Sequence, residues 1–135
     1  MPEGVGYGPQ DTASVGLNLN VIGNHAYAYS GILDIDNNET TLIEFTSGNF
    51  SLVGEWQGYY YEATATSDYR WVLYFNDIKI ESFIAEAAIR GNSRSPLKLI
   101  IPPFTVVKIT GQNVEDSGQR EIMASITGRI YGKIK

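Results

Sequence analysis

The side chains of this sequence that could do chemistry are few, and the first is its single histidine. His25 would have to serve any histidine-based metal site or Ser-His-Asp triad alone, and nearby Ser30 belongs to no nucleophile motif. The chain contains no Cys, which removes disulfides, zinc–thiolate sites, iron–sulfur ligation and thiol nucleophiles together. We interpret His25 as an ordinary residue at the start of a strand.

A short acidic segment is spaced like part of a calcium site. Asp34, Asp36 and Asn38 match the first ligands of an EF-hand loop. The sixth position of that loop is Glu39 instead of Gly, and the twelfth is Phe45 instead of Glu. These departures exclude an EF-hand. A looser calcium site remains an alternative to a solvated strand end, and we predict no bound metal.

Glutamates could in principle supply the pair of carboxylates that glycoside hydrolysis needs. The candidates are Glu44, Glu55, Glu62 and Glu81. Strand alternation places each of them on a solvent face, and sequence spacing cannot establish a catalytic pair. The glycines of GVGYG at residues 4–8 precede no strand–helix unit and so predict no phosphate site. We therefore expect no enzymatic activity and no cofactor.

Aromatic side chains form the densest local cluster of the sequence. The predicted oligomer or ligand interface consists of Trp56, Tyr59, Tyr60, Tyr61, Tyr69 and Trp71. Exposed rings on a sheet could stack on sugar faces, as in carbohydrate-binding modules, or fill a subunit interface. Buried rings would instead be ordinary core with cross-strand pairs. Because residues 69–75 carry aromatic side chains on both faces, we expect a partner to cover one of them.

The elements that must position these side chains are strands. From His25 onward, apolar and polar residues alternate with period two, and Gly, Asn, Asp or Pro interrupts the pattern at short intervals. The predicted strands cover residues 25–36, 40–46, 50–66, 69–75, 78–84, 97–101, 104–112 and 122–134. This pattern predicts an all-β, antiparallel, eight-stranded β-sandwich. The jelly roll is the preferred topology, and an immunoglobulin-like topology is the alternative.

For two of these strands, the alternation predicts which side chains share a face of the sheet. In the first, the alternation places Tyr27, Tyr29, Leu33 and Ile35 on one face. In residues 122–134, the even-numbered positions include four Ile and form the expected core face, while the odd-numbered positions face solvent or a partner.

The first 24 residues differ from the rest of the chain. They are rich in Gly, contain no basic residue and show no sustained period, so we expect an extended N-terminal arm at 1–24 ahead of a β-sandwich domain at 25–135. The alternating Val15, Leu17, Leu19 and Val21 are the expected arm contacts, either with a partner or with the parent domain.

The charge is acidic and unevenly distributed. A net charge of −5 argues against direct nucleic-acid binding, which needs clustered Lys and Arg. Residues 1–69 carry nine acids and no Lys or Arg, whereas residues 70–135 carry ten basic residues and six acids, giving −9 and +4. Complementary halves would suit ordered self-association. Without a signal peptide or an apolar run of about 18 residues, we expect a chain that is made soluble, with no membrane contact.

Several segments together resemble small β-sandwich virion proteins of tailed bacteriophages. They are the acidic arm, NHAYAYSG at 24–31, NNETTLIEFTSG at 37–48, YRWVLYFNDIKI at 69–80, LIIPPFTVVKIT at 99–110 and SITGRIYG at 125–132. The resemblance implies a non-enzymatic virion subunit, in particular a trimeric capsid decoration (cement) protein that binds the major capsid protein at the capsid surface. It assigns no site residue. The alternative function is a receptor- or carbohydrate-binding module that uses the aromatic cluster.

Overall fold

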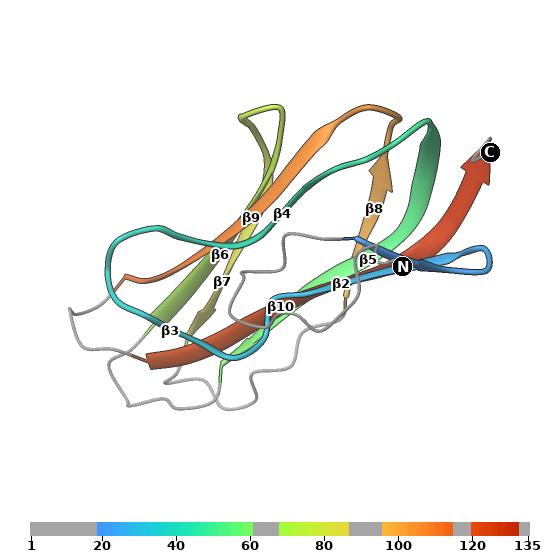
Figure 1. Cartoon of the computed structure of the whole chain (residues 1–135). Coiled ribbons are helices and arrows are strands. Elements are labelled where there is room, and N and C mark those ends of the chain that lie inside the picture. The colour runs from blue at the N-terminus through green and yellow to red at the C-terminus, as the bar shows by residue number, and fades with distance from the viewer. Residues whose placement is uncertain (1–18, 61–67, 87–95, 115–119, 133–135) are drawn as a thin grey trace.

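The computed structural model of this chain describes residues 19–60, 68–86, 96–114 and 120–132. Every regular element in these ranges is a β-strand, and the strand pairs are antiparallel. Ten strands form two sheets that enclose a common core (Figure 1). The prediction of an all-β protein with antiparallel sheets is confirmed.

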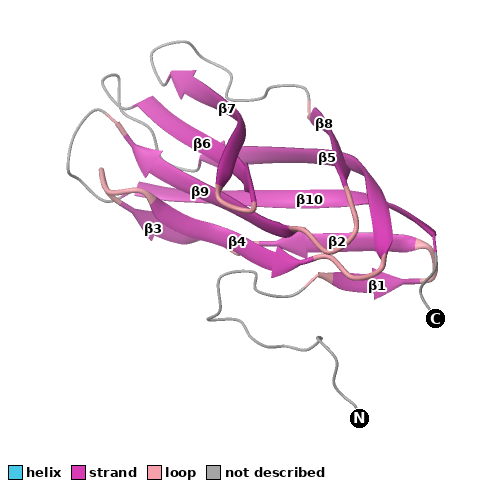
Figure 2. Cartoon of the chain, turned by 90° about the horizontal axis from the view of Figure 1, so that it is seen from above, coloured by secondary structure: helices cyan, strands magenta, loops and turns pink. Residues whose placement is uncertain are grey.

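The first sheet is built around its longest strand, β10. Its members are β1 (Asn20–Ile22), β2 (His25–Tyr29), β3 (Leu33–Ile35), β5 (Phe50–Tyr60), β8 (Leu97–Ile101) and β10 (Arg120–Gly132). They are ordered β1-β2-β10-β5-β8, and β3 pairs with the beginning of β10. Figure 2 shows β10 running between β2 and β5, so it is the strand that joins the two halves of this sheet.

The second sheet has four strands. They are β4 (Thr40–Thr46), β6 (Asp68–Phe75), β7 (Ile78–Glu86) and β9 (Val106–Asn113), in the order β4-β9-β6-β7. Asn76 and Asp77 join β6 to β7 with φ angles of 51° and 67°. Two successive positive φ values are typical of a type I′ hairpin turn, which is the tight connection expected from this dipeptide.

The buried faces of the strands follow the alternation of the sequence. In β10, Ile122, Ala124 and Ile126 are fully buried, whereas Thr127 and Arg129 are exposed. The predicted core face is therefore confirmed at Ile122, Ala124 and Ile126, while Ile130 is half-buried and Gly132 is exposed. Residues 133–135, which include the last predicted core position, lie outside the described residues.

The first predicted strand is split into β2 and β3. Between them Gly31 has a φ of 78°, a left-handed conformation that favours glycine. The buried Ser30 hydroxyl accepts a hydrogen bond of 2.9 Å from a β10 backbone N–H at this point. Because the break shifts the alternation, Tyr27 and Tyr29 are exposed while Ile35 is buried. The prediction that these side chains share one face is wrong.

The predicted arm contributes a strand of its own. Asn20 and Ile22 of β1 pair with Tyr27 and His25 of β2, and Leu19 packs against the core. Residues 20–22 of the predicted arm thus form an edge strand of the first sheet. This strand and the split of the first predicted strand raise the number of described strands from the predicted eight to ten. Val21 lies exposed in β1, while Val15 and Leu17 fall outside the described residues.

Candidate functional site

Three of the six aromatic residues predicted to form an interface are core residues. Trp56, Tyr69 and Trp71 are fully buried. The Trp56 indole N–H donates to Glu81 Oε1 at 2.9 Å across the two sheets, and the Trp71 N–H donates to the Met123 carbonyl at 3.3 Å. Rings held in this way fill the space between the sheets. The structure therefore corrects their assignment to an interface.

The other three predicted interface residues lie on or near β5. Tyr59 is half-buried, and its hydroxyl donates to Gln57 Oε1 at 3.1 Å. The Tyr60 side chain and Tyr61 lie outside the described residues. The cluster is thus divided between core and surface, because neighbouring residues of a strand point to opposite faces.

The tyrosines that do reach solvent on the first sheet come from other strands. Tyr27, Tyr29 and Tyr131 are exposed on β2 and β10, and the Tyr29 hydroxyl donates to Met123 Sδ at 3.3 Å. Sequence reasoning did not select them. In β2, large Tyr alternates with small Ala, so the tyrosines share one face of the strand. The sequence does not show that the Ala side chains face the core and the Tyr side chains face solvent.

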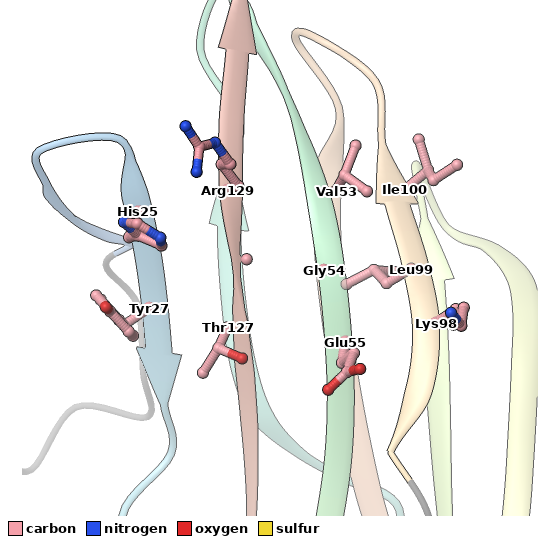
Figure 3. Close-up of a pocket in the computed structure, with 11 residues that line it drawn as sticks. His25, Tyr27, Val53, Gly54, Glu55, Lys98, Leu99, Ile100, Thr127 and Arg129 are labelled. Atoms are coloured by element: carbon pink, nitrogen blue, oxygen red, sulfur yellow. The ribbon is translucent and has the colours of Figure 1, made fainter.

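Strand register places two rows of side chains side by side on the outer face of this sheet. One row runs Tyr27, Thr127, Glu55, Lys98 across β2, β10, β5 and β8. The next row runs His25, Arg129, Val53, Ile100. These eight side chains surround a hollow of 490 Å³ (Figure 3). We call it the hollow below.

The floor of the hollow requires two glycines. Gly54 of β5 lies directly opposite Gly128 of β10. A Cβ atom on Gly54 would lie 2.0 Å from the Thr127 carbonyl oxygen and 2.5 Å from the Gly128 Cα atom, both in the backbone. At the Gly54–Gly128 pair, β5 and β10 therefore lie closer together than residues with side chains would allow.

The groups around the hollow combine apolar surface with a small excess of positive charge. Val53, Ile100 and the Tyr27 ring offer apolar surface, and Arg129 and Lys98 outnumber Glu55 by one positive charge. Across the part of the chain that the structure describes, no three His, Asp or Glu side chains come together in a way that could hold a metal ion. His25 lies at the edge of the hollow on β2 (Figure 3).

Opposite charges from the two halves of the chain meet across strands. Glu55 of β5 is paired with Lys98 of β8, and Glu44 of β4 with Lys108 of β9. Cross-strand pairs of opposite charge stabilise a sheet by a few tenths of a kcal/mol, roughly. Strand register thus places charges of the two halves opposite each other within one chain, while the Lys108 ammonium lies 3.8 Å from Asp77 of its own half.

The outer face of the second sheet carries a hydrogen-bonded carboxylate. Glu39 Oε2 accepts hydrogen bonds from the Thr110 hydroxyl at 2.6 Å and the Tyr74 hydroxyl at 2.5 Å. The hydrogen bond from Thr110, followed by that from Tyr74, lowers the pKa of Glu39 below its ordinary value of 4.5. The same contact with Glu39 raises the pKa of Tyr74 above 10.0. This network ties the segment before β4 to β9 and β6.

Both pKa shifts predict a pH dependence of stability. A carboxyl with a lowered folded-state pKa stabilises the fold above its unfolded value, and that stabilisation is lost as the pH falls through the folded value. A tyrosine with a raised pKa stabilises below its unfolded value and loses this as the pH rises. We expect Glu39→Gln to flatten the stability profile below about pH 4.5 and above about pH 10.

Urea unfolding at several pH values measures this effect, with Tyr74→Phe as the comparison. The Tyr74→Phe variant should lose the alkaline dependence and keep part of the acid dependence, because Thr110 still donates to Glu39. A Glu39→Gln profile parallel to that of the wild type from pH 3 to 6 would contradict the assignment.

The loop between β8 and β9 holds an exposed aromatic residue in an unusual conformation. Phe104 has a φ of 53° and is 71% exposed. A bulky side chain in the left-handed region costs roughly 1–2 kcal/mol relative to the right-handed conformation. In the sequence, Phe104 follows Pro102 and Pro103 and begins the predicted strand at 104–112, which gives no sign of this strain.

Comparison with protein-family models, curated proteins and solved structures found no match to this chain. In the described ranges there is also no helix of the length and apolarity needed to span a membrane.

Proposed function

We propose that this chain is a non-enzymatic structural virion protein, an oligomeric capsid decoration (cement) protein that forms trimers on the capsid surface. Its partners are further copies of itself and the major capsid protein. The residues quoted above for the resemblance to virion proteins of tailed bacteriophages are the starting point. The strand pairing is the observation that carries the proposal.

The proposed topology is a jelly roll. Strand β2 pairs with β10, β4 with β9, β5 with β8, and β6 with β7. The eight strands therefore pair as one long hairpin that is folded over into two sheets, with β1 and β3 as additions. This nesting is the connectivity of a jelly-roll β-sandwich, an architecture that recurs in viral capsid and lectin domains.

Exposed apolar side chains support a protein that works in contact with others. Ile22, Ile78, Ile100 and Phe104 are between 64% and 71% exposed. They lie on three edge strands, β1, β7 and β8, and on the turn after β8. Edge strands and exposed apolar groups are the usual places at which sheets associate.

A receptor- or carbohydrate-binding module is the second candidate, and the tyrosines beside the hollow favour it. Tyr27 contributes an exposed ring next to Thr127, Glu55 and Arg129, which could donate to or accept from sugar hydroxyls. A glycan array separates the two functions, since only the second predicts a signal that Tyr27→Ala removes.

Quantitative mass spectrometry of purified virus particles tests the proposed function. Because one fold serves many functions, the measurement must detect the chain in the particle itself. A cement protein is expected in hundreds of copies per particle, in fixed proportion to the major capsid protein. A few dozen copies would indicate a fibre or vertex protein instead, and absence of the chain from particles would overturn the proposal.

A further inference from the structure

The loop that carries Phe104 is rigidly held although its central side chain is exposed. The buried Ser47 hydroxyl donates to the Pro102 carbonyl and accepts from the Thr105 N–H, each at 2.8 Å. The Phe104 N–H donates to the Gly48 carbonyl at 2.9 Å. Residues 102–105 are thus tied to the turn between β4 and β5, at the upper end of the molecule in Figure 1.

This arrangement is the reverse of what stability alone would select. A residue at positive φ would normally be Gly or Asn, and an exposed phenyl ring contributes little to the core. Strain that the surrounding structure maintains is characteristic of functional positions. A ring held in one place before binding also loses less entropy on association, so Phe104 has the properties of an interface anchor.

The hollow offers a surface on this molecule that fits such a ring. Its volume of 490 Å³ exceeds the roughly 150 Å³ that suffices to hold a benzene molecule. Val53, Ile100 and Tyr27 provide apolar contact for a phenyl ring. The hollow itself carries one excess positive charge, from Arg129 and Lys98 against Glu55.

We infer that Phe104 of one copy of this chain inserts into the hollow of a second copy. This inference rests on the oligomeric state in the proposed function and names the surfaces that form it. The anchor and the hollow are different surfaces, so each copy contributes one of each to its neighbours. Such a head-to-tail contact closes into a ring when the rotation between copies permits. A trimer is one such ring.

A protein partner is favoured over a lipid surface by the charges near the loop. Asn76, which precedes Asp77 in the turn between β6 and β7, is hydrogen-bonded to Val106, two residues after Phe104, and Lys108 is 3.8 Å from Asp77. Charges of both signs therefore lie near the start of β9, whereas attraction to an anionic membrane requires a basic cluster.

Light scattering after size-exclusion chromatography at micromolar concentration tests the contact with three variants of the full chain. The wild type should elute as a multiple of the 14.9 kDa chain. Phe104→Gly removes the anchor without touching a buried side chain, so it should run as a folded monomer. Ile100→Asp places a charge in the hollow and should also give a monomer. Ile84→Asp, at an exposed isoleucine of β7, is the matched control and should leave the wild-type mass unchanged.

Mixing the two interface variants gives the sharpest outcome. Phe104→Gly retains an intact hollow, and Ile100→Asp retains an intact anchor. An equimolar mixture should therefore form a species of two chains and no larger one, because only one of the possible contacts is restored.

Three results would overturn the inference. They are a monomeric wild type, a Phe104→Gly variant with the wild-type mass, and a mixture that remains monomeric. A glycan that binds the monomeric wild type and is lost in Ile100→Asp would assign the hollow to a sugar instead. If the chain is abundant in particles but the Phe104→Gly variant keeps the wild-type mass, the contact is rejected and the proposed function stands. If the chain is absent from particles, the proposed function is rejected, and the mixing experiment still decides whether the contact forms.

Discussion

The Ile126→Asp variant is expected to yield no folded protein. Ile126 is fully buried in β10, between Ala28 of β2 and Trp56 of β5. Burial of such a side chain contributes roughly 1.5–3 kcal/mol, and a carboxylate there would have no compensating partner. The total loss should be about 5 kcal/mol or more, which is comparable with the whole stability of a small domain.

Circular dichroism and solubility of the expressed variant measure this result. Tyr131→Asp is the matched control, because it introduces the same charge into the same strand at an exposed position opposite Ser51. The control should unfold within about 1 kcal/mol of the wild type. If Ile126→Asp melted like the wild type, the assignment of the core face of β10 would be wrong.

The Gly54→Ala variant is expected to be the most damaging single-methyl substitution in the described part of the chain. The added Cβ would lie 2.0 Å from the Thr127 carbonyl oxygen, and backbone atoms cannot move aside as a side chain can. Relief would require opening the ladder between β5 and β10, which contains eleven residue pairs. Overpacking usually costs about 1–3 kcal/mol, and this site should reach about 3 kcal/mol or more.

Urea unfolding against Glu55→Ala tests the close approach of the two strands. Glu55 is the next residue of β5 and is exposed, so its truncation should change the stability by about 0.5 kcal/mol at most. Gly128→Ala should also destabilise the fold. The double variant should lose less stability than the sum of the two single variants, because Gly54 and Gly128 are paired with each other and both methyl groups separate the strands at the same position. A fully stable Gly54→Ala variant would show that the strands separate there at little cost.

The hollow illustrates how a surface site can escape sequence analysis. Its side chains come from β2, β5, β8 and β10, which are far apart in the chain and meet only through strand register. Glu55 and His25 were considered individually, as a possible catalytic carboxylate and a strand residue. Nothing in their spacing places them beside Arg129 and Lys98, since register depends on long-range pairing.

The strands themselves could be predicted because their pattern is local. Alternation of apolar and polar residues indicated β4 and β8 with the bounds that the structure has, and it identified the core face of β10. The predicted strands at 69–75 and 78–84 leave Asn76 and Asp77 as the turn, and both residue types tolerate the positive φ found there. These features follow from the conformational preferences of short segments.

Tertiary structure alone decided which aromatic residues are buried and which contact solvent. Trp56, Tyr69 and Trp71 fill the space between the sheets, while Tyr27 and Tyr29 face outward because a break at Gly31 shifts the alternation. Alternation with a period of two shows which residues share a face of a strand, but it does not show which face packs against the other sheet. That choice is made by packing between strands distant in sequence, since only the assembled core determines where large rings fit.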